Sequence, residues 1–341
     1  MDFSSDTSAP AHHLVIEAIA AANSGNAASY GADAITARVR ACLSDILETD
    51  DFDFWLCASG TASNALALSV MCSSTGAIIC HEEAHIERDE RGAPEFFTGG
   101  AKLNLLPGHG AQISEDALRS TLAGIDRTFV HETPAEVLSL TNLTECGTAY
   151  PVGQVGEYAA LAKACGLTMH LDGARLANAL ALTGASPAQM TWQAGIDVVT
   201  LGLTKTGAMG CELIILFGAM RQKYAELQAR AKRSGHMPAK MRFLAAQAEA
   251  MLTDGLWLEL AAQANAKATQ LAGSLCAHRD VELAYPTDGN EVFAILPTAL
   301  AADLISAGAK IYPWHGGSHR FVCSWNTSES DLLALHKAVS Q

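Results

Sequence analysis

The sequence predicts an α/β fold in which a large domain, built on a mostly parallel sheet covered by helices, precedes a smaller α/β domain. Short apolar runs alternate with helical patterns through the first two thirds of the chain, and longer helical patterns follow residue 217. The 341 residues also exceed the roughly 100–200 residues usual for one domain. We therefore expect a large domain over 1–235, including an N-terminal arm, and a small C-terminal domain over 236–341.

The apolar runs define the expected elements of each domain. In the large domain we expect strands at 52–58, 77–80, 128–131, 137–140, 167–171, 198–201 and 213–217, with helices at 62–71, 155–165 and 220–233. Beyond the boundary we expect a long helical stretch over 240–275 that includes helices at 245–251 and 256–271. Short strands and helices follow at 281–284, 291–295, 299–307, 310–313, 320–323 and 330–339. In a parallel sheet of this kind, ligands bind beyond the carboxyl ends of the strands.

Charge and cysteine content exclude several classes of partner. The formal charge of −14 argues against nucleic acid or an anionic membrane as the main partner. No apolar stretch reaches the roughly 20 residues needed to cross a bilayer, so we expect no membrane association. The nine cysteines form no C-x-x-C pair, which favours reduced thiols and a cytoplasmic location.

Lys205 lies in a turn rich in glycine and threonine between two apolar strands. A solvated surface lysine would be the plainer interpretation, but the flanking residues are small and apolar. A desolvated amine is nucleophilic, which Schiff-base chemistry requires.

Asp172 ends the buried strand that precedes the strand leading to Lys205. Its carboxylate could simply cap the following helix. Alternatively, a buried carboxylate keeps a pyridine nitrogen protonated, so that the ring accepts electrons. The order of Asp172 and Lys205 on successive strand ends favours the second interpretation.

Residues 59–64, Ser-Gly-Thr-Ala-Ser-Asn, lie between a strand and a helix. Gly60 permits a tight turn, and the free N–H groups at the helix start favour a phosphate. A plain N-cap would explain one of the hydroxyls of Ser59, Thr61 and Ser63, but not all three. The segment is neither a Walker A loop nor G-x-G-x-x-G, so it does not favour nucleotide binding.

His81 and His85 are four residues apart in the string H-E-E-A-H, a spacing that could indicate a zinc site with Glu82 as base. Gly92 and Pro94 end this segment early, and zinc would explain none of the other motifs. We therefore expect no metal. His85 is a better candidate for an aromatic plate over a cofactor ring and for a base.

In chain order these segments resemble the low-specificity L-threonine aldolase family, the β-eliminating-lyase branch of the fold-type-I pyridoxal 5′-phosphate (PLP) enzymes. The resemblance covers essentially the whole chain and is greatest to the subgroup that includes phenylserine aldolases. It rests on residues 3–7 (FSSDT), 30–33 (YGAD), 59–64 (SGTASN), 85–95, 170–175 (HLDGAR), 203–205 (LTK), 233–243 and 319–322.

The resemblance implies three catalytic residues: Lys205 holds PLP, Asp172 pairs with its pyridine nitrogen, and His85 stacks on its ring. The other cofactor-binding residues that it implies are Ser59, Gly60, Thr61, Arg175, Lys232 and Arg242. The substrate-binding residues that it implies are Ser5, Tyr30, Arg175 and Arg320, the two arginines and Ser5 for the substrate carboxylate. Glu145 and His131 are further substrate-binding candidates that the resemblance does not itself supply. Because Tyr30, Lys232 and Arg242 match positions that reach a neighbouring subunit's site, it also implies a homodimer or homotetramer with shared active sites.

Glu145 departs from the pattern, since better-known members of the family carry near this position a histidine that contacts the substrate hydroxyl. The base that removes the hydroxyl proton therefore stays open between His85, Glu145 acting through water, and His131.

The activity implied is retro-aldol cleavage of L-threonine, L-allo-threonine or related β-hydroxy-α-amino acids such as phenylserine, giving glycine and an aldehyde. The L configuration rests on the resemblance alone. The main alternative is another PLP activity on a small amino acid, as in a racemase or a β-eliminating lyase. A non-catalytic protein of this fold would be expected to lack Lys205 or the two arginines, and all three are present.

Overall fold

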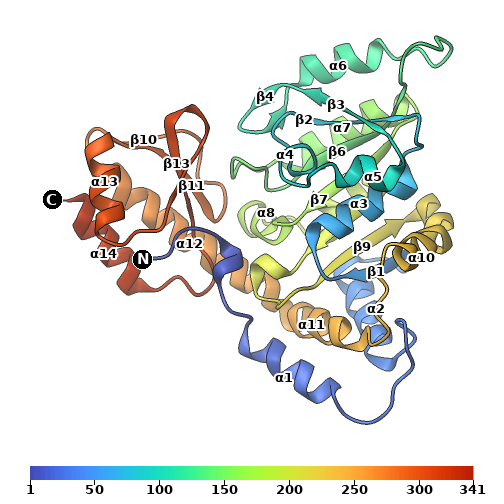
Figure 1. Cartoon of the computed structure of the whole chain (residues 1–341), viewed down its shortest axis with the longest axis horizontal. Coiled ribbons are helices and arrows are strands. Elements are labelled where there is room, and N and C mark those ends of the chain that lie inside the picture. Colours follow the sequence, from blue (N-terminus) through green and yellow to red (C-terminus); the bar gives the residue numbers. More distant parts are fainter. Residues whose placement is uncertain (341) are drawn as a thin grey trace.

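A computed structural model describes residues 1–340 and has a large and a small lobe (Figure 1). The large lobe contains a seven-stranded sheet in the order β1-β9-β8-β7-β6-β2-β3. Its strands are β1 (Phe52–Cys57), β2 (Ala77–His81), β3 (Lys102–Leu106), β6 (Ala135–Thr141), β7 (Thr168–Gly173), β8 (Val198–Gly202) and β9 (Glu212–Phe217). Only β9 runs antiparallel to its neighbours, which confirms the predicted mostly parallel sheet.

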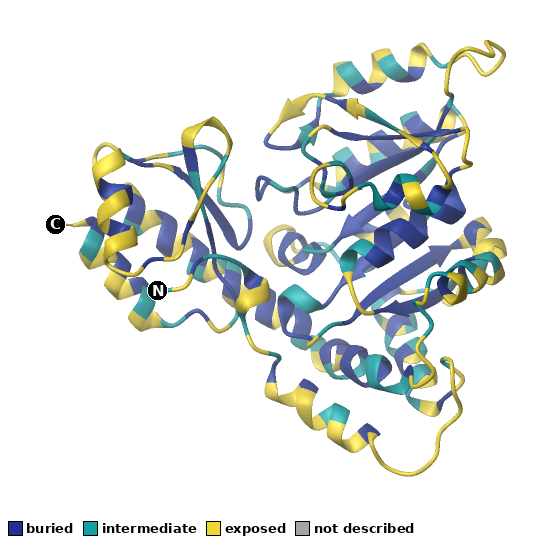
Figure 2. Ribbon diagram, viewed as in Figure 1, coloured by how far each residue is buried: buried dark blue, intermediate teal, exposed yellow. Residues whose placement is uncertain are grey.

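Helices cover this sheet, and its central strands are almost wholly buried (Figure 2). Every residue of β8 and β9 is buried, as expected for strands with both faces covered. The helices of the lobe are α2 (Ala34–Leu47), α3 (Gly60–Met71), α4 (His85–Arg88), α5 (Ala93–Thr98), α6 (Glu115–Ala123), α7 (Val152–Ala164), α8 (Leu176–Thr183), α9 (Pro187–Met190), α10 (Tyr224–Arg233) and α11 (Arg242–Leu252). A small hairpin joins β4 (Gly108–His109) to β5 (Gln112–Ile113).

The small lobe packs three helices against a four-stranded antiparallel sheet. The helices are α12 (Leu256–Cys276), α13 (Thr298–Ser306) and α14 (Glu329–Val339), and the sheet order is β10 (Glu282–Leu283), β11 (Glu291–Ile295), β13 (Ser318–Val322), β12 (Tyr312–Pro313). The start of the chain joins this lobe, where Phe3 donates its N–H to the Lys310 carbonyl at 3.1 Å. The chain then crosses to the large lobe, where α1 (His13–Ala22) packs on α11.

Two hydrophobic clusters form the cores, and α12 contributes to both. The larger cluster extends along the chain to Ala261, and the smaller contains Phe3 and residues from Ala268 onward. The packing therefore places α11 with the large core. The division between 1–235 and 236–341 stays a prediction. In the described part of the chain, no helix combines the length and hydrophobicity needed to cross a membrane.

One expected strand was wrong. Residues 128–131 form an exposed turn rather than a strand, and the apolar side chain of Val130 is 88% exposed. The expected helices at 245–251 and 256–271 correspond to α11 and α12, which are separated where Asp254 and Gly255 adopt positive φ angles of 52° and 72°. Several elements were not anticipated at all: α1, α2, α5, α6, α8 and β3.

Gly202 lets β8 approach the turn that follows β7. A Cβ at this position would lie 2.6 Å from the Ala174 carbonyl oxygen and 2.7 Å from its Cα. We expect Gly202→Ala to lower the free energy of unfolding by about 1–3 kcal/mol, because backbone cannot yield as a flexible side chain would. Gly156→Ala in α7 is the matched control, since its Cβ would meet nothing within 4 Å. Equal urea midpoints for both variants would contradict this prediction.

Candidate active site

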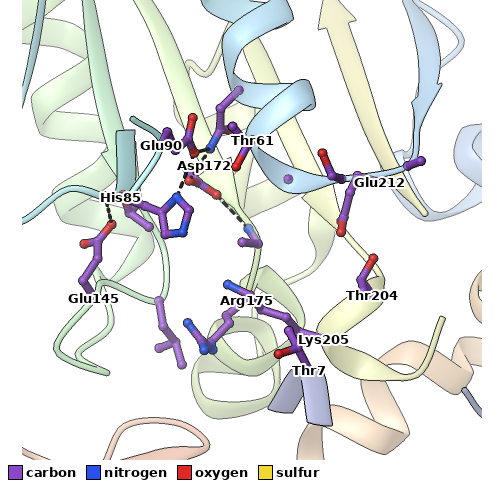
Figure 3. A pocket seen from close by; sticks show the side chains of 17 residues that line it. Thr7, Thr61, His85, Glu90, Glu145, Asp172, Arg175, Thr204, Lys205 and Glu212 are labelled. Carbon is purple, nitrogen blue, oxygen red and sulfur yellow. Dashed lines mark hydrogen bonds and ion pairs between the residues drawn. The ribbon is translucent and has the colours of Figure 1, made fainter. Parts of the chain in front are cut away.

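A cavity of about 270 Å³ opens at the carboxyl ends of β7 and β8, where α/β sheets bind their ligands. Its wall includes residues from β7, α3, α4, the turn after β8, and the N-terminal arm (Figure 3). The predicted site residues that line it are Ser59, Gly60, Thr61, His85, Glu145, Asp172, Arg175 and Lys205. Further lining residues include Thr7, Asn64, Glu90, Thr204 and Glu212.

Asp172 is held in a fixed orientation at the end of β7. Its Oδ1 accepts the N–H of Ala174 at 2.9 Å, and its Oδ2 accepts an N–H of the Asn64 side chain at 2.7 Å. The residue is 2% exposed. The bond to Ala174 is the local turn contact that a capping aspartate would make. The bond from Asn64, on α3, instead fixes the carboxylate from across the site.

Glu90 pairs with His85 beneath the cavity wall. His85 Nδ1 lies 2.8 Å from Glu90 Oε1, and the same oxygen accepts the second N–H of Asn64 at 2.8 Å. Burial lowers the pKa of His85, but the hydrogen bond to Glu90 and the charge of Asp172 outweigh it and raise that pKa overall. Glu90 is bonded to Nδ1 of the imidazole, so Nε2 is the ring nitrogen left for another partner.

Glu145 is hydrogen-bonded to the start of α4, where His85 lies. Its Oε1 accepts the backbone N–H of His85 at 2.7 Å, whereas its buried Oε2 has no hydrogen-bond partner among the described residues. Burial raises the pKa of this carboxyl to about 7, with the charge of Asp172 acting in the same direction. Glu145 is therefore partly ionised near neutral pH.

Lys205 lies on a single 3₁₀ turn, Thr204–Thr206, directly after β8. Its amine makes no hydrogen bond or ion pair with any of residues 1–340. The turn is held from β9: Glu212 Oε2 accepts the N–H of Leu203 at 3.0 Å, and burial raises the pKa of Glu212 to about 7. A half-buried amine with no partner, facing a cavity, is placed to react with a carbonyl group.

The start of α3 presents N–H groups to the cavity. Ser59 is the N-cap and accepts the N–H of Ala62 at 3.3 Å, while Ser63 donates its hydroxyl to the Ser59 carbonyl at 3.1 Å. These two hydroxyls are thus engaged locally. The N–H groups of Gly60 and Thr61 have no acceptor within the helix, and a Cβ on Gly60 would meet nothing within 4 Å, so an anion has room to approach.

Arg175 enters the cavity already bound to two carboxylates. Its Nε and Nη2 donate to Asp6 at 2.8 and 3.2 Å, and its Nη1 lies 3.4 Å from Glu291 Oε2. Arg320, on β13, lies 3.9 Å from Glu291 Oε1 and donates to the Ser4 carbonyl at 3.4 Å. The two arginines therefore face one another across Glu291.

Six predicted residues do not line the cavity: Arg320, which is linked to it only through Glu291 and Arg175, and His131, Lys232, Tyr30, Arg242 and Ser5. His131 is in the exposed turn over 128–131. Lys232 Nζ lies 4.7 Å from the Tyr30 ring centroid, and Arg242 donates to the Gly25 carbonyl at 3.0 Å. Ser5 caps the 3₁₀ turn that carries Thr7 to the cavity.

His81 and His85 do not share a helix face, because His81 ends β2 and His85 begins α4. The helical H-E-x-x-H geometry of a zinc site is thus not formed. Within residues 1–340, no three His, Cys, Asp or Glu side chains are grouped to hold a metal ion.

Sequence reasoning missed Asn64, Glu90, Glu212, Asp6 and Glu291 as site residues. Asp6, Asn64 and Glu90 lie within the motifs at 3–7, 59–64 and 85–95. For Asp6 and Asn64 the available signal was a polar side chain beside small or apolar residues. Glu212 and Glu291 are each the first residue of an apolar strand, and a carboxylate buried there needs a partner.

We expect Glu90→Gln to lower the pKa of His85, because it removes the negative charge bonded to the ring. The measurement is an NMR titration of the His85 imidazole, assigned with His85→Asn. Asp89→Asn, one residue away and exposed, is the control and should leave the titration unchanged. An unaltered His85 midpoint in Glu90→Gln would show that Glu90 does not govern this proton.

The chain is similar to known proteins over nearly its whole length. The β-eliminating lyase family model matches residues 2–298. A low-specificity L-threonine aldolase from Pseudomonas sp. strain NCIMB 10558 is 38% identical over 92% of this chain and 90% of its own length, and one from Pseudomonas aeruginosa is 37% identical over 94% and 92%. The structure of Leishmania major threonine aldolase superposes with a TM-score of 0.91 at 28% identity, covering 99% of this chain and 98% of that one. The chain therefore belongs to the β-eliminating lyase family, whose threonine aldolases are PLP-dependent lyases.

Proposed function

We propose that this enzyme cleaves L-threonine, L-allo-threonine and related β-hydroxy-α-amino acids to glycine and an aldehyde. The observation that carries the proposal is the partnerless amine of Lys205 in the same cavity as the anchored carboxylate of Asp172. The likeness to aldolases over more than nine tenths of the chain supports the same reaction.

The residues present fit PLP. Lys205 would hold its aldehyde carbon, Asp172 its ring nitrogen, His85 one ring face, and the N–H groups of Gly60 and Thr61 its phosphate. When bound, PLP supplies an electron sink for the bond that is broken. The α3 N-terminus and the cavity's basic residues offset the net charge of −14 for an anionic ligand.

Arg175 and Arg320 would bind the substrate carboxylate, since a guanidinium matches a carboxylate with two parallel N–H groups. Asp6 fixes the plane of Arg175 through a two-point ion pair. Holding the carboxylate orients the bond between Cα and Cβ within the cavity, which is the protein's main contribution to the choice of bond broken.

Glu145 is our choice for the group that accepts the β-hydroxyl proton. Its Oε2 has no other partner, and its carboxyl is partly ionised near neutral pH. His85 is the alternative, but its raised pKa leaves less of the neutral ring to accept a proton. His131 would need the turn over 128–131 to move toward the cavity.

We also propose that the enzyme works in the cytoplasm as a homodimer or homotetramer. All nine cysteines are free thiols, which suits a reducing compartment. Tyr30, Lys232 and Arg242 lie outside this chain's cavity, so a role for them at an active site requires that of a second subunit.

A racemase is the second candidate. An alanine racemase from Cochliobolus carbonum is 28% identical over 174 residues, which is 51% of this chain. Racemisation needs the same lysine and aspartate, so product analysis must separate the two activities.

Purified enzyme incubated with PLP and L-threonine should release glycine and acetaldehyde in equal amounts. Lys205→Ala should abolish the reaction, whereas Lys337→Ala, at an exposed position on α14, should retain it. Chromatography of the amino acids with an aldehyde assay makes the measurement. Formation of D-alanine from L-alanine, with no glycine from L-threonine, would replace the aldolase proposal by the racemase.

We expect Glu145→Gln to lower kcat by about 10²–10⁴-fold, the usual contribution of a general base. A carboxyl acting as base must be ionised, so wild-type kcat/KM, which reports the pKa values of the free enzyme, should rise with pH through about 7, the pKa of Glu145. The variant should lose this rise. A variant that keeps both the rise and the rate would transfer the role to His85.

A further inference from the structure

Glu291 is a buried carboxylate placed between the two arginines of the site. It lies on β11 in the small lobe, and its side chain is 1% exposed. Its Oε2 is 3.4 Å from Arg175 Nη1 and its Oε1 is 3.9 Å from Arg320 Nη1. Neither oxygen makes a hydrogen bond within residues 1–340.

Arg175 does not need Glu291 to hold its position. Asp6 already binds it through two hydrogen bonds, and Asn290 donates to the same Asp6 carboxylate at 3.1 Å. A buried carboxylate without hydrogen bonds normally destabilises a protein. Glu291 therefore calls for an explanation other than support of Arg175.

Glu291 also lies close to the wall of the cavity. A Cβ on Gly147, two residues after Glu145, would be 3.2 Å from the Cβ of Glu291. The Cβ of Glu291 thus packs against the loop that carries Glu145, while its carboxylate contacts the two arginines that would meet a substrate carboxylate.

We propose that Glu291 is a positioning residue that competes with the substrate carboxylate for Arg175 and Arg320, and that it takes up a proton from solvent when the substrate binds. The inference rests on the proposed function, because it assumes that these two arginines hold the substrate. With Asp6 and Glu291 both ionised, the cluster of two arginines and two carboxylates has no net charge. Once Glu291 is neutral, one positive charge is free for the incoming carboxylate.

The surroundings of Glu291 favour the protonated form of its carboxyl group. Burial raises its pKa, and the charge of Asp6 acts in the same direction, while Arg175, Arg320 and Lys205 oppose the shift. A third carboxylate, that of the substrate, adds a further like charge that favours the neutral form. Binding of the carboxylate should then weaken as pH rises and Glu291 ionises.

The test compares the KM of wild type and Glu291→Gln for L-threonine at pH 6.5 and pH 8.5. We expect the variant to have a roughly tenfold lower KM at pH 8.5, the order of effect of one like charge in a partly buried site. At pH 6.5 the difference should be smaller, and kcat should change less than KM. Because both proteins bind the same amine, its own titration cancels in the ratio. The direct readout is the proton uptake at pH 8.5 when glycine binds, measured by calorimetry in buffers of different ionisation enthalpy, which should fall in the variant.

Glu282→Gln, on the neighbouring strand β10 and exposed, is the matched control and should keep the wild-type KM at both pH values. Glu291→Asp keeps the negative charge but shortens the side chain by one methylene, which moves the carboxylate away from the arginines. It should therefore give an intermediate KM, and it replaces the glutamine variant if that variant fails to fold. An equal or higher KM in these variants at pH 8.5 overturns the inference. If wild type releases no glycine from L-threonine, the proposed function fails instead, and the calorimetric comparison with glycine still tests Glu291.

Discussion

The site depends on one amide. Asn64, buried on α3, donates one N–H to Asp172 and the other to Glu90, so two buried carboxylates are fixed by a neutral group from a third element. One carboxylate ends β7 and faces the cavity; the other holds His85. Asn64 thus links the end of β7, through Asp172, with the connection between α4 and α5, through Glu90, and sets the carboxylate that would bind the ring nitrogen relative to the imidazole.

Charge in the cavity is controlled through burial. Burial raises the pKa values of Glu145, Glu212 and Glu291, so each of these carboxyls exchanges a proton more readily near neutral pH than an exposed glutamate would. The positive groups act at two ends of the cavity. The start of α3 would serve a phosphate and Arg175 a carboxylate, so a ligand carrying both is aligned between them.

The sequence predicted the parts of the site that follow from strand ends. Lys205, Asp172 and the segment from Ser59 to Thr61 meet because the sheet brings successive strand ends together, and this follows from the alternation of elements. The contacts of Asn64 with Glu90 and of Arg175 with Glu291 join residues distant in sequence, and no local pattern encodes such pairs. The same limit explains why the strand predicted at 128–131 is wrong. The short apolar run is present in the sequence, but in the structure it has no neighbouring strand with which to pair. This limit also explains His131, which spacing alone could not place.

The central claim is that Lys205 and Asp172 act on one PLP molecule in this cavity. A crystal structure of the enzyme loaded with PLP tests it most directly. Our account predicts a covalent bond from Lys205 Nζ to the cofactor, the ring nitrogen within hydrogen-bonding distance of Asp172, and the phosphate at the N–H groups of Gly60 and Thr61. A cofactor bound to another lysine, or turned so that its ring nitrogen faces away from Asp172, would contradict it.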